Sequence, residues 1–292
     1  MLALQLLVNG LIAGAVYALI SLGFAVIYNG TRVLHLAHGG IFAFGAYMLW
    51  TFNILLAFNI ALAFFCSIVL SAAFGAFVEV FVYRHLRARK SSADAVVVAS
   101  LGVLILTQAT IALVFGTDTL FLHEEALSTY ELGGIILSRL HVAVVVVAIV
   151  VFPVLHYFIS YTKYGRAIRA LADNPDLLQL FGVDRDRLYV LIFGLGSGLA
   201  ALAGGLIAFD SGTQPEMGFH IMFIALTAVI VGGLGYLPGA AAGGLIVGLL
   251  QNLSLWPFAQ RWQDIVVFGA LIVFLLVRPQ GVFGSMLVIR RV

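Results

Sequence analysis

Long apolar stretches recur along the whole chain and are separated by short polar segments. They do not alternate apolar and polar residues with the period of two that is typical of a half-buried strand. A bilayer core about 30 Å thick is crossed by roughly 20 helical residues, and a backbone without water must satisfy its own hydrogen bonds. The pattern therefore predicts membrane helices near residues 3–28, 37–53, 58–82, 94–116, 141–160, 188–209, 220–236, 239–255 and 263–277.

Composition supports this interpretation. Of the 292 residues, 63% are hydrophobic and only 10% are charged, and the mean hydropathy is +1.13. We expect an all-α, polytopic membrane protein with about nine transmembrane helices and one transmembrane domain over residues 1–292. Eight or ten spans stay open, because three stretches (37–53, 220–236 and 239–255) are short or interrupted by glycine.

The first stretch has no basic residues before it, so we expect a retained span rather than a cleaved signal peptide.

Basic residues predict the orientation. Nine spans with the N-terminus outside and the C-terminus in the cytoplasm let thirteen of the fifteen Lys and Arg residues obey the positive-inside rule. The exceptions are Arg139 and Arg261, and the acidic loop 117–140 falls outside. The basic residues assigned to the cytoplasm are Arg32; Arg84, Arg87, Arg89 and Lys90; Lys163, Arg166, Arg169, Arg185 and Arg187; and Arg278, Arg290 and Arg291.

Residues 161–187 form a charged block within this apolar chain. The block holds five of the fifteen basic residues and four of the thirteen acidic ones. We expect one short helix near 164–172, then a second that starts with Asn174 as N-cap and Pro175 in the first helical position and ends at Gly182. A helix that short is marginal in water and has to pack on something. The apolar residues that it would expose are Leu177, Leu178, Leu180 and Phe181.

Two interpretations of this block remain from the pattern alone. It is either a loop helix folded back on its own bundle or a cytoplasmic element that docks on a partner protein.

The order of several motifs resembles the permease subunits of branched-chain amino acid ABC importers. In the charged block the resemblance rests on Gly165-Arg166-Ala167, Arg169-Ala170, Asn174-Pro175, Leu180, Gly182-Val183 and Arg187. Elsewhere it rests on Asn9-Gly10, Tyr17-Ala18-Leu19, Gly23, Ala37-His38-Gly39, Gly45-Ala46-Tyr47, Gly232-Gly233-Leu234-Gly235, Pro238-Gly239-Ala240, Gly243-Gly244 and Arg278-Pro279-Gln280-Gly281-Val282-Phe283-Gly284. The resemblance covers nearly the whole chain.

The resemblance implies a multi-pass permease of a bacterial-type inner membrane that moves branched-chain or other hydrophobic amino acids by alternating access. It also implies partners: two ABC ATPase subunits, a second permease that is identical or homologous, and an external substrate-binding protein. In this family the cytoplasmic block acts as a coupling helix on an ATPase. The corresponding residues here are Arg166, Arg169, Asn174, Pro175, Leu177, Leu178, Phe181 and Gly182. No cofactor, metal or nucleic acid is implied.

One departure from the family widens the range of cargo. Family members commonly carry Asn-Phe before Ala-His-Gly, and this chain has His35-Leu36 there. Urea, short amides and other small polar solutes therefore stay as alternative cargoes.

The sequence has no site of its own for ATP. Neither of its two lysines, Lys90 and Lys163, lies in GxxxxGK[ST], so the phosphate-binding loop is missing. The Gly196-Ser197-Gly198 run is not a nucleophile motif, and the single Cys66 leaves no cysteine-based metal site. We therefore expect no enzyme activity on this chain, with ATP bound by partners. An ion-coupled transporter or a channel would also lack the loop.

Broken helices predict where a solute could bind, because their exposed N-termini hold anionic groups. One break precedes 37–53 at His38, Gly39 and Gly40, and the other lies at Gly232 and Gly233. Both are also consistent with tight turns at the cytoplasmic rim. Thr107 and Gln108 lie inside the fourth stretch and are further candidates for the pathway.

Other polar residues have milder interpretations. We expect His35 to lie at the membrane interface and Glu79 to pair with Arg84 or Tyr83 at the cytoplasmic rim. A polar turn that contains Asp210, Ser211, Gln214 and Glu216 is expected outside, where it would line an entrance or contact a delivery protein.

Overall fold

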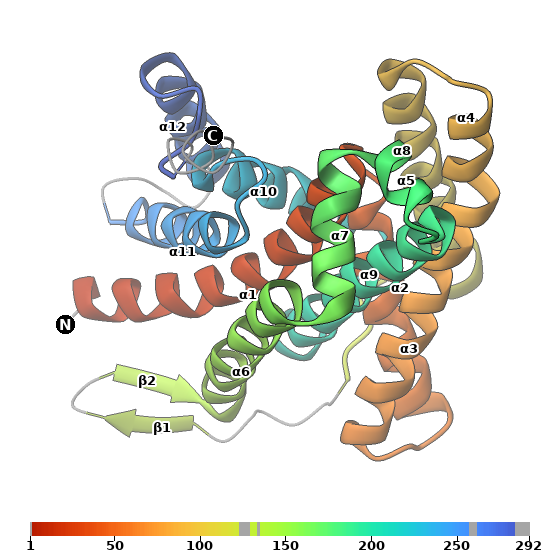
Figure 1. Cartoon of the computed structure of the whole chain (residues 1–292). Helices are drawn as coiled ribbons and strands as arrows, with labels where there is room; N and C mark the ends of the chain where they lie inside the picture. The colour runs from red at the N-terminus through yellow and green to blue at the C-terminus, as the bar shows by residue number, and fades with distance from the viewer. Residues whose placement is uncertain (1, 123–128, 133–134, 257–261, 284–292) are drawn as a thin grey trace. The chain divides into compact units, whose positions relative to one another are not determined.

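The computed structural model describes residues 2–122, 129–132, 135–256 and 262–283 and is mostly helical (Figure 1). Residues 123–128 and 133–134 of the acidic loop lie outside this described part, as do Arg261, Gly284, Arg290 and Arg291.

Helices follow the apolar pattern closely. The elements are α1 (Leu2–Thr31), α2 (His38–Trp50), η1 (Thr51–Leu55), α3 (Ile60–Val78), η2 (Glu79–Tyr83), α4 (Arg84–Ala88), α5 (Ala93–Phe115), β1 (Thr129–Leu132), β2 (Ile135–Ser138), α6 (Arg139–Tyr161), α7 (Lys163–Asp173), α8 (Pro175–Leu180), α9 (Arg185–Ser211), α10 (Met217–Gly232), α11 (Leu237–Leu253) and α12 (Gln263–Val277). Here η1 and η2 are π-helical turns, and η2 joins α3 to α4.

Each predicted apolar stretch contains a helix, which confirms the helical class. Five helical segments of the described chain are long and apolar enough to cross a bilayer: Leu2–Thr31, Ile60–Ala88, Ala93–Phe115, Arg139–Tyr161 and Arg185–Ser211. The pair α10 and α11 would count as a sixth span, but it is bent by 120° at the turn between the helices. With only 13 and 15 residues, α2 and α12 are shorter than the roughly 20 residues that cross a bilayer. Helix length alone therefore does not support nine crossings.

The hairpin β1–β2 was not expected. It lies within the predicted external loop, and its strands pair antiparallel with Thr129 opposite Ser138. Its outer edge is capped by Gln5 of α1: the side-chain Nε2 donates to the Ile136 carbonyl at 3.1 Å, and the Ile136 N–H donates to Oε1 at 2.9 Å. Sequence pattern misses such a strand because only four residues on each side form it.

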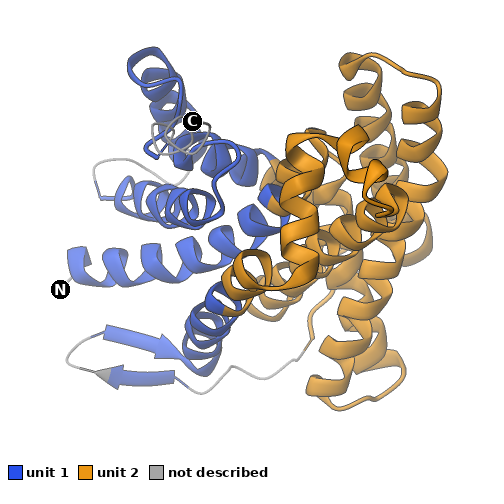
Figure 2. Ribbon diagram, in the orientation of Figure 1, with its two compact units in different colours: residues 1–25, 123–153, 223–292 blue, residues 26–122, 154–222 orange. Residues whose placement is uncertain are grey.

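The chain divides into two compact units, coloured separately in Figure 2. Unit 1 comprises residues 1–25, 123–153 and 223–292, and unit 2 comprises residues 26–122 and 154–222. Neither unit is continuous in sequence, because α1, α6 and α10 each contribute residues to both.

In unit 1, glycines bring α1 and α11 into backbone contact. A Cβ on Gly244 would meet the backbone of Ala18, and a Cβ on Gly248 would meet Gly14. The Tyr17 hydroxyl donates to Gln251 Oε1 at 2.5 Å across the same pair of helices. Small residues at such crossings are how membrane helices approach closely enough to gain dispersion energy.

In unit 2, α2 is the central helix. Ten of its thirteen residues are buried, and it packs on α3, α5 and α9. The crossing with α9 is tight: a Cβ on Gly204 would meet the Phe42 carbonyl, and one on Gly45 would meet Ala201. The large side chains at its centre, such as Phe42 and Tyr47, are fully buried. This helix therefore links the other spans of the unit.

An ion cluster centred on Arg87 ties α4 to the start of α9. Its guanidinium donates to the Glu79 carboxylate, lies 3.8 Å from an oxygen of Asp186, and stands 3.8 Å from the centre of the Tyr189 ring. Arg84 pairs with Asp186 at 2.8 Å. Glu79 was expected to pair with Arg84 or Tyr83, and this prediction is wrong. The Glu79 side chain is 1% exposed, so its charge is compensated by Arg87 almost without solvent.

The crossing of α2 and α9 gives a matched test on one helix. Gly204→Ala would drive a methyl group into the Phe42 carbonyl, whereas at Gly194 the nearest neighbour is the Ala72 oxygen at 3.7 Å. Both changes gain the same helix propensity, about 1 kcal/mol, but overpacking costs about 1–3 kcal/mol. We expect Gly204→Ala to lower the thermal unfolding midpoint in detergent and Gly194→Ala to leave it unchanged or raise it. Equal shifts would contradict the tight crossing.

The ion cluster predicts unequal roles for two neighbouring arginines. Arg87→Gln leaves the buried Glu79 carboxylate without its partner, a loss that costs about 3–5 kcal/mol for buried pairs. Arg84→Gln removes a half-exposed pair, worth about 0–1 kcal/mol. Thermal unfolding in detergent should show a large drop for the first variant and little for the second. Adding Glu79→Gln to Arg87→Gln should recover part of the loss, and no recovery would argue against a buried charge as its cause.

Candidate functional site

The charged block 161–187 folds as two short helices, α7 and α8, as predicted. The Thr162 hydroxyl caps α7 by accepting from the Gly165 N–H at 3.1 Å. Asn174 caps α8 by accepting from the Leu177 N–H at 2.9 Å, with Pro175 in the first helical position. The chain then turns at Gly182, whose φ of +74° is the left-handed conformation that favours glycine. The sequence predicted the cap at Asn174, the proline at position 175 and the turn at Gly182, but not the cap at Thr162.

The two arginines of the block face their own chain. Arg166 Nη1 donates to the Tyr161 carbonyl at 3.2 Å, and Arg169 Nη1 donates to the Ile159 carbonyl. Both acceptors belong to the last turn of α6, whose carbonyls have no helical partner. Gly165 packs against the same turn, where a Cβ would meet the Ile159 carbonyl. In this structure Arg166 and Arg169 therefore fix α7 on α6.

The apolar side chains of α8 divide into one anchor and an exposed group. Leu178 is only 7% exposed, so the expectation that it would be exposed for docking is wrong. Leu177, Leu180 and Phe181 are 49%, 83% and 77% exposed. We call these three residues the apolar tip. Because α8 also packs on α7 and α9, the tip is presented from a supported helix rather than from a loose loop.

The start of α9 completes the block. Asp184 caps it by accepting from the N–H groups of Asp186 (2.9 Å) and Arg187 (3.3 Å). Arg185 pairs with Asp176 of α8 at 3.5 Å. The block is thus attached to α6 at one end and to α9 at the other.

The first predicted break, at the start of α2, is closed rather than open. The N–H groups of Ala37, His38 and Gly39 already donate to Ser100 Oγ, the His35 carbonyl and the Leu36 carbonyl, at 2.9, 3.1 and 3.3 Å. An anion would find these donors occupied. The role of this break in the pathway stays a prediction.

Glycines at this break are packed against other helices. A Cβ on Gly39 would meet the Gly218 carbonyl, and one on Gly40 would lie 3.3 Å from the Thr107 side chain. Thr107 itself is buried, and its hydroxyl donates to the Val103 carbonyl at 2.8 Å. His38, Gly39, Gly40 and Thr107 therefore lie close together in one packed region of unit 2.

His35 is buried within the chain, and its expected place at the membrane interface stays a prediction. It lies in the connection between α1 and α2, and its Nδ1 is 2.7 Å from the Tyr83 hydroxyl. Burial, together with the neighbouring His38, holds the pKa of His35 well below its usual range. The ring therefore stays neutral and acts as a packed hydrogen-bonding group at the end of the helices.

The second predicted break is a tight turn between α10 and α11 in unit 1. Gly233 and Gly235 have φ values of +110° and +94°. Gly232 packs directly on Gly239. The Val282 N–H donates to the Val231 carbonyl at 2.8 Å and so closes the turn from the chain that follows α12. Of the two interpretations of this break, the structure agrees with a tight turn at Gly232 and Gly233.

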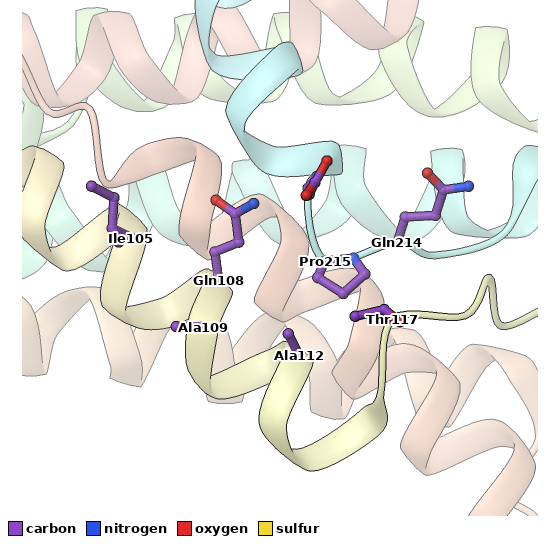
Figure 3. Close-up of a pocket in the computed structure, with 8 residues that line it drawn as sticks. Ile105, Gln108, Ala109, Ala112, Thr117, Gln214 and Pro215 are labelled. Carbon is purple, nitrogen blue, oxygen red and sulfur yellow. The ribbon is translucent and has the colours of Figure 1, made fainter.

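A cavity of about 490 Å³ lies between α5 and the segment before α10 (Figure 3). Its size is within the range of about 300–1,000 Å³ typical of small-molecule sites. Among the predicted pathway residues that the structure describes, Gln108 lines it, and Thr107 does not. The full lining is Ile105, Gln108, Ala109, Ala112, Thr117, Gln214, Pro215 and Glu216.

Sequence reasoning found part of this cavity. Gln108 was marked by its place in an apolar helix, and Gln214 and Glu216 by the polar turn. Pro215 belongs to the same turn, whereas Thr117 carried no signal, since only the fold brings it beside residues 214–216. Asp210 and Ser211 do not line the cavity.

The described residues do not assemble a metal site, because no group of three His, Cys, Asp or Glu side chains lies close enough together.

Comparison with known proteins agrees with this picture. The family model for the branched-chain amino acid transport system permease component matches residues 6–276. The chain is 32% identical to the high-affinity branched-chain amino acid transport system permease protein BraD of Pseudomonas aeruginosa, over 96% of this chain and 95% of that one. It is 31% identical to LivH of Escherichia coli K12, a protein of the same description, with the same coverage.

Two further matches are more distant. A ribose import permease protein of Haemophilus influenzae is 32% identical but over only 47% of this chain and 44% of its own. The solved structure of PsaBC from Streptococcus pneumoniae in complex with Fab is 13% identical, covers 95% of this chain and 94% of that one, and has a TM-score of 0.52, so it shows a common fold.

With a family model over almost its whole length and full-length relatives above 30% identity, this chain belongs to the permease component family of branched-chain amino acid transport systems.

Proposed function

We propose that this chain is the membrane-spanning permease subunit of an ATP-driven ABC importer that moves branched-chain or other hydrophobic amino acids across the inner membrane by alternating access. The full-length relatives are named for high-affinity branched-chain amino acid transport. The sequence lacks GxxxxGK[ST], so ATP must be hydrolysed on partner subunits. The single observation that carries the proposal is the supported apolar tip, Leu177, Leu180 and Phe181, at the end of a charged block.

The proposed topology has nine spans in one transmembrane domain, with the N-terminus outside and the C-terminus in the cytoplasm. Contacts within unit 2 support it. Arg84 meets Asp186, and both belong to segments that the charge pattern places inside. At the other ends of the helices, Leu120 and Thr213 exchange two backbone hydrogen bonds, and both belong to segments placed outside.

Contacts within unit 1 also join residues that the proposed topology places on the same side of the membrane. Gln5 pairs with Ile136 on the side assigned to the exterior. The Val282 N–H donates to the Val231 carbonyl on the side assigned to the cytoplasm. A topology with one span added or removed between these segments would place bonded residues on opposite sides of the bilayer.

The apolar tip is proposed to rest in a groove of an ATPase subunit. Its three exposed side chains present a compact apolar surface, and the charged residues around it keep the segment in water. Apolar anchors with a polar rim are the usual anatomy of a protein interface. Asn174, Pro175 and Gly182 shape the helix that carries the tip, and the buried Leu178 holds it.

The block can transmit movement because it is fixed at both ends. Arg166 and Arg169 join α7 to the end of α6, and Arg185 joins α8 to the start of α9. Since α9 packs on α2 and α3, a displacement of α8 by closing ATPases would reach the central helix of unit 2. The full complex in this proposal has two ATPases, a second permease and an external binding protein.

Reconstitution tests the function itself. In proteoliposomes that contain the chain with its cognate permease and ATPase partners, import of L-leucine delivered by the binding protein should require ATP inside the vesicle. The purified chain alone should give no import, with or without an ion gradient, because it has no energy source. Solute transport by the chain alone under an ion gradient would contradict the proposal and favour a secondary transporter.

Docking is tested on α8. Replacing Leu177, Leu180 and Phe181 together with serine should abolish co-purification of the ATPases, because the apolar anchors are lost. Gln179→Ser is the matched control: it is exposed on the same helix and is not part of the tip. Thermal unfolding of the isolated chain should stay unchanged in both variants. Retention of the ATPases by the triple variant would show that docking occurs elsewhere.

A further inference from the structure

The cavity beside α5 combines three kinds of surface. Glu216 supplies a carboxylate, whereas Gln108, Gln214 and Thr117 supply amide and hydroxyl groups. The remaining wall is apolar and comes from Ile105, Ala109, Ala112 and Pro215 (Figure 3). A site with one acid, several neutral donors and an aliphatic wall has separate places for an ammonium group, a carboxylate and an apolar side chain.

Gln108 is the residue that points to a ligand. It lies inside a 23-residue apolar helix, seven residues before its end, and its side-chain amide makes no hydrogen bond to any residue that the structure describes. Neighbouring polar residues of α5 behave differently: Thr107 and Thr110 donate to carbonyls of their own helix at 2.8 and 2.7 Å. A polar group at membrane depth without a partner is costly unless it faces water or a solute.

The rim of the cavity is held in place by bonds that leave ligand groups available. Leu120 and Thr213 exchange backbone hydrogen bonds of 3.1 and 2.8 Å. Gln214 Nε2 donates to Thr119 Oγ1 at 2.7 Å, so the amide is oriented while its oxygen remains an acceptor. Glu216 is exposed and stands directly before α10. The site is thus preorganised on the side assigned to the exterior.

We propose that this cavity is the outer receiving site for a zwitterionic α-amino acid, an inference that rests on the proposed import function. Glu216 accepts from the ammonium group, and the Gln108 amide and the Thr117 hydroxyl donate to the carboxylate. The aliphatic side chain lies on Ile105, Ala109 and Ala112. The carboxylate of Glu216 attracts an ammonium group more strongly than the neutral N–H groups of a solute such as urea, so the cavity deepens the proposal by assigning the groups of the amino acid to named residues.

The first experiment compares the loss of the Glu216 charge with the loss of a nearby acidic charge outside the cavity. In proteoliposomes with the complete importer and L-leucine-loaded binding protein, Glu216→Gln should lower the L-leucine imported per ATP hydrolysed by roughly tenfold, as the loss of one charge-assisted hydrogen bond predicts. Asp118→Asn is the control, because it removes an exposed acid next to Thr117 that does not line the cavity. Equal effects of the two variants, or no effect of Glu216→Gln, would overturn the inference.

A second readout separates solute binding from docking of the binding protein. The affinity of the binding protein for the importer should be the same for the wild type and Glu216→Gln. A weaker affinity would assign Glu216 to docking and would overturn the inference. Gln108→Leu, deeper along α5, should also lower import per ATP without changing that affinity, and normal import by this variant would count against the site.

A third experiment does not depend on transport activity. In a Cys66→Ser background, Gln108→Cys in outside-facing vesicles should react with a membrane-impermeant thiol reagent, and millimolar L-leucine should slow the reaction. Leu106→Cys should not react, because this residue is 67% exposed on the same helix, does not line the cavity and lies further from the outer end of α5, where lipid would cover it. Absence of labelling at position 108 would overturn the inference. If the wild type fails to import L-leucine with ATP, the proposed function fails, while this labelling still decides whether the cavity opens outward and binds the amino acid.

Discussion

The compensation of one buried carboxylate organises the end of unit 2 at which α4 meets the start of α9. Glu79 lies in a membrane-spanning segment and is almost completely buried, so it needs a cation at close range. Arg87 provides it and at the same time contacts Asp186 and the ring of Tyr189. The residue that neutralises Glu79 thereby fixes the start of α9 to the end of the α3–α4 span. Because α8 leads directly into α9, the position of the apolar tip depends on the same ion cluster.

From this cluster a continuous series of packed contacts leads toward the cavity. Gly204 allows α9 to press on the backbone of α2 at Phe42, and Gly40 lets α2 approach α5 at Thr107. Gln108, the next residue of α5, lines the cavity. Well-packed helices that meet backbone to backbone move together rather than deform, since close-packed interiors have little free volume. Mechanical coupling between the charged block and the solute site therefore needs no long-range field, only contact through α9, α2 and α5.

Local physics explains what the sequence predicted correctly. The caps at Asn174, the proline at position 175 and the left-handed turn at Gly182 depend on neighbours within four residues, so they could be read directly. Tertiary packing decides the rest. Leu177 and Leu178 are adjacent and equally apolar, yet one is exposed and the other anchors α8. Because both residues are leucine, residue type alone could not predict which of them is buried.

Partners that are distant in sequence were equally hard to predict. Glu79 was expected to reach Arg84 or Tyr83, but a π-helical turn begins at Glu79 and changes the positions of the residues that follow. Its partner is Arg87, eight residues away. The cavity has the same origin: it joins residue 108 of one helix to residues 214–216 of a segment about a hundred residues later. Gln108 gave a signal as a polar residue in an apolar helix, and Gln214 and Glu216 gave one as part of a polar turn, but nothing in the sequence showed that they share a cavity.

An exposed receiving site also suits a cargo that must leave again. A salt bridge at 4 Å contributes about 1 kcal/mol in bulk water but about 4 kcal/mol near a partly dehydrated protein surface. Glu216 is exposed in the structure, so its attraction for an ammonium group is weak while the cavity is open. Closing the cavity would exclude water and strengthen that attraction. A ligand shifts a conformational equilibrium only by its difference in affinity for the two states, and the exclusion of water around Glu216 supplies a larger difference for an ammonium-bearing solute than for a neutral one.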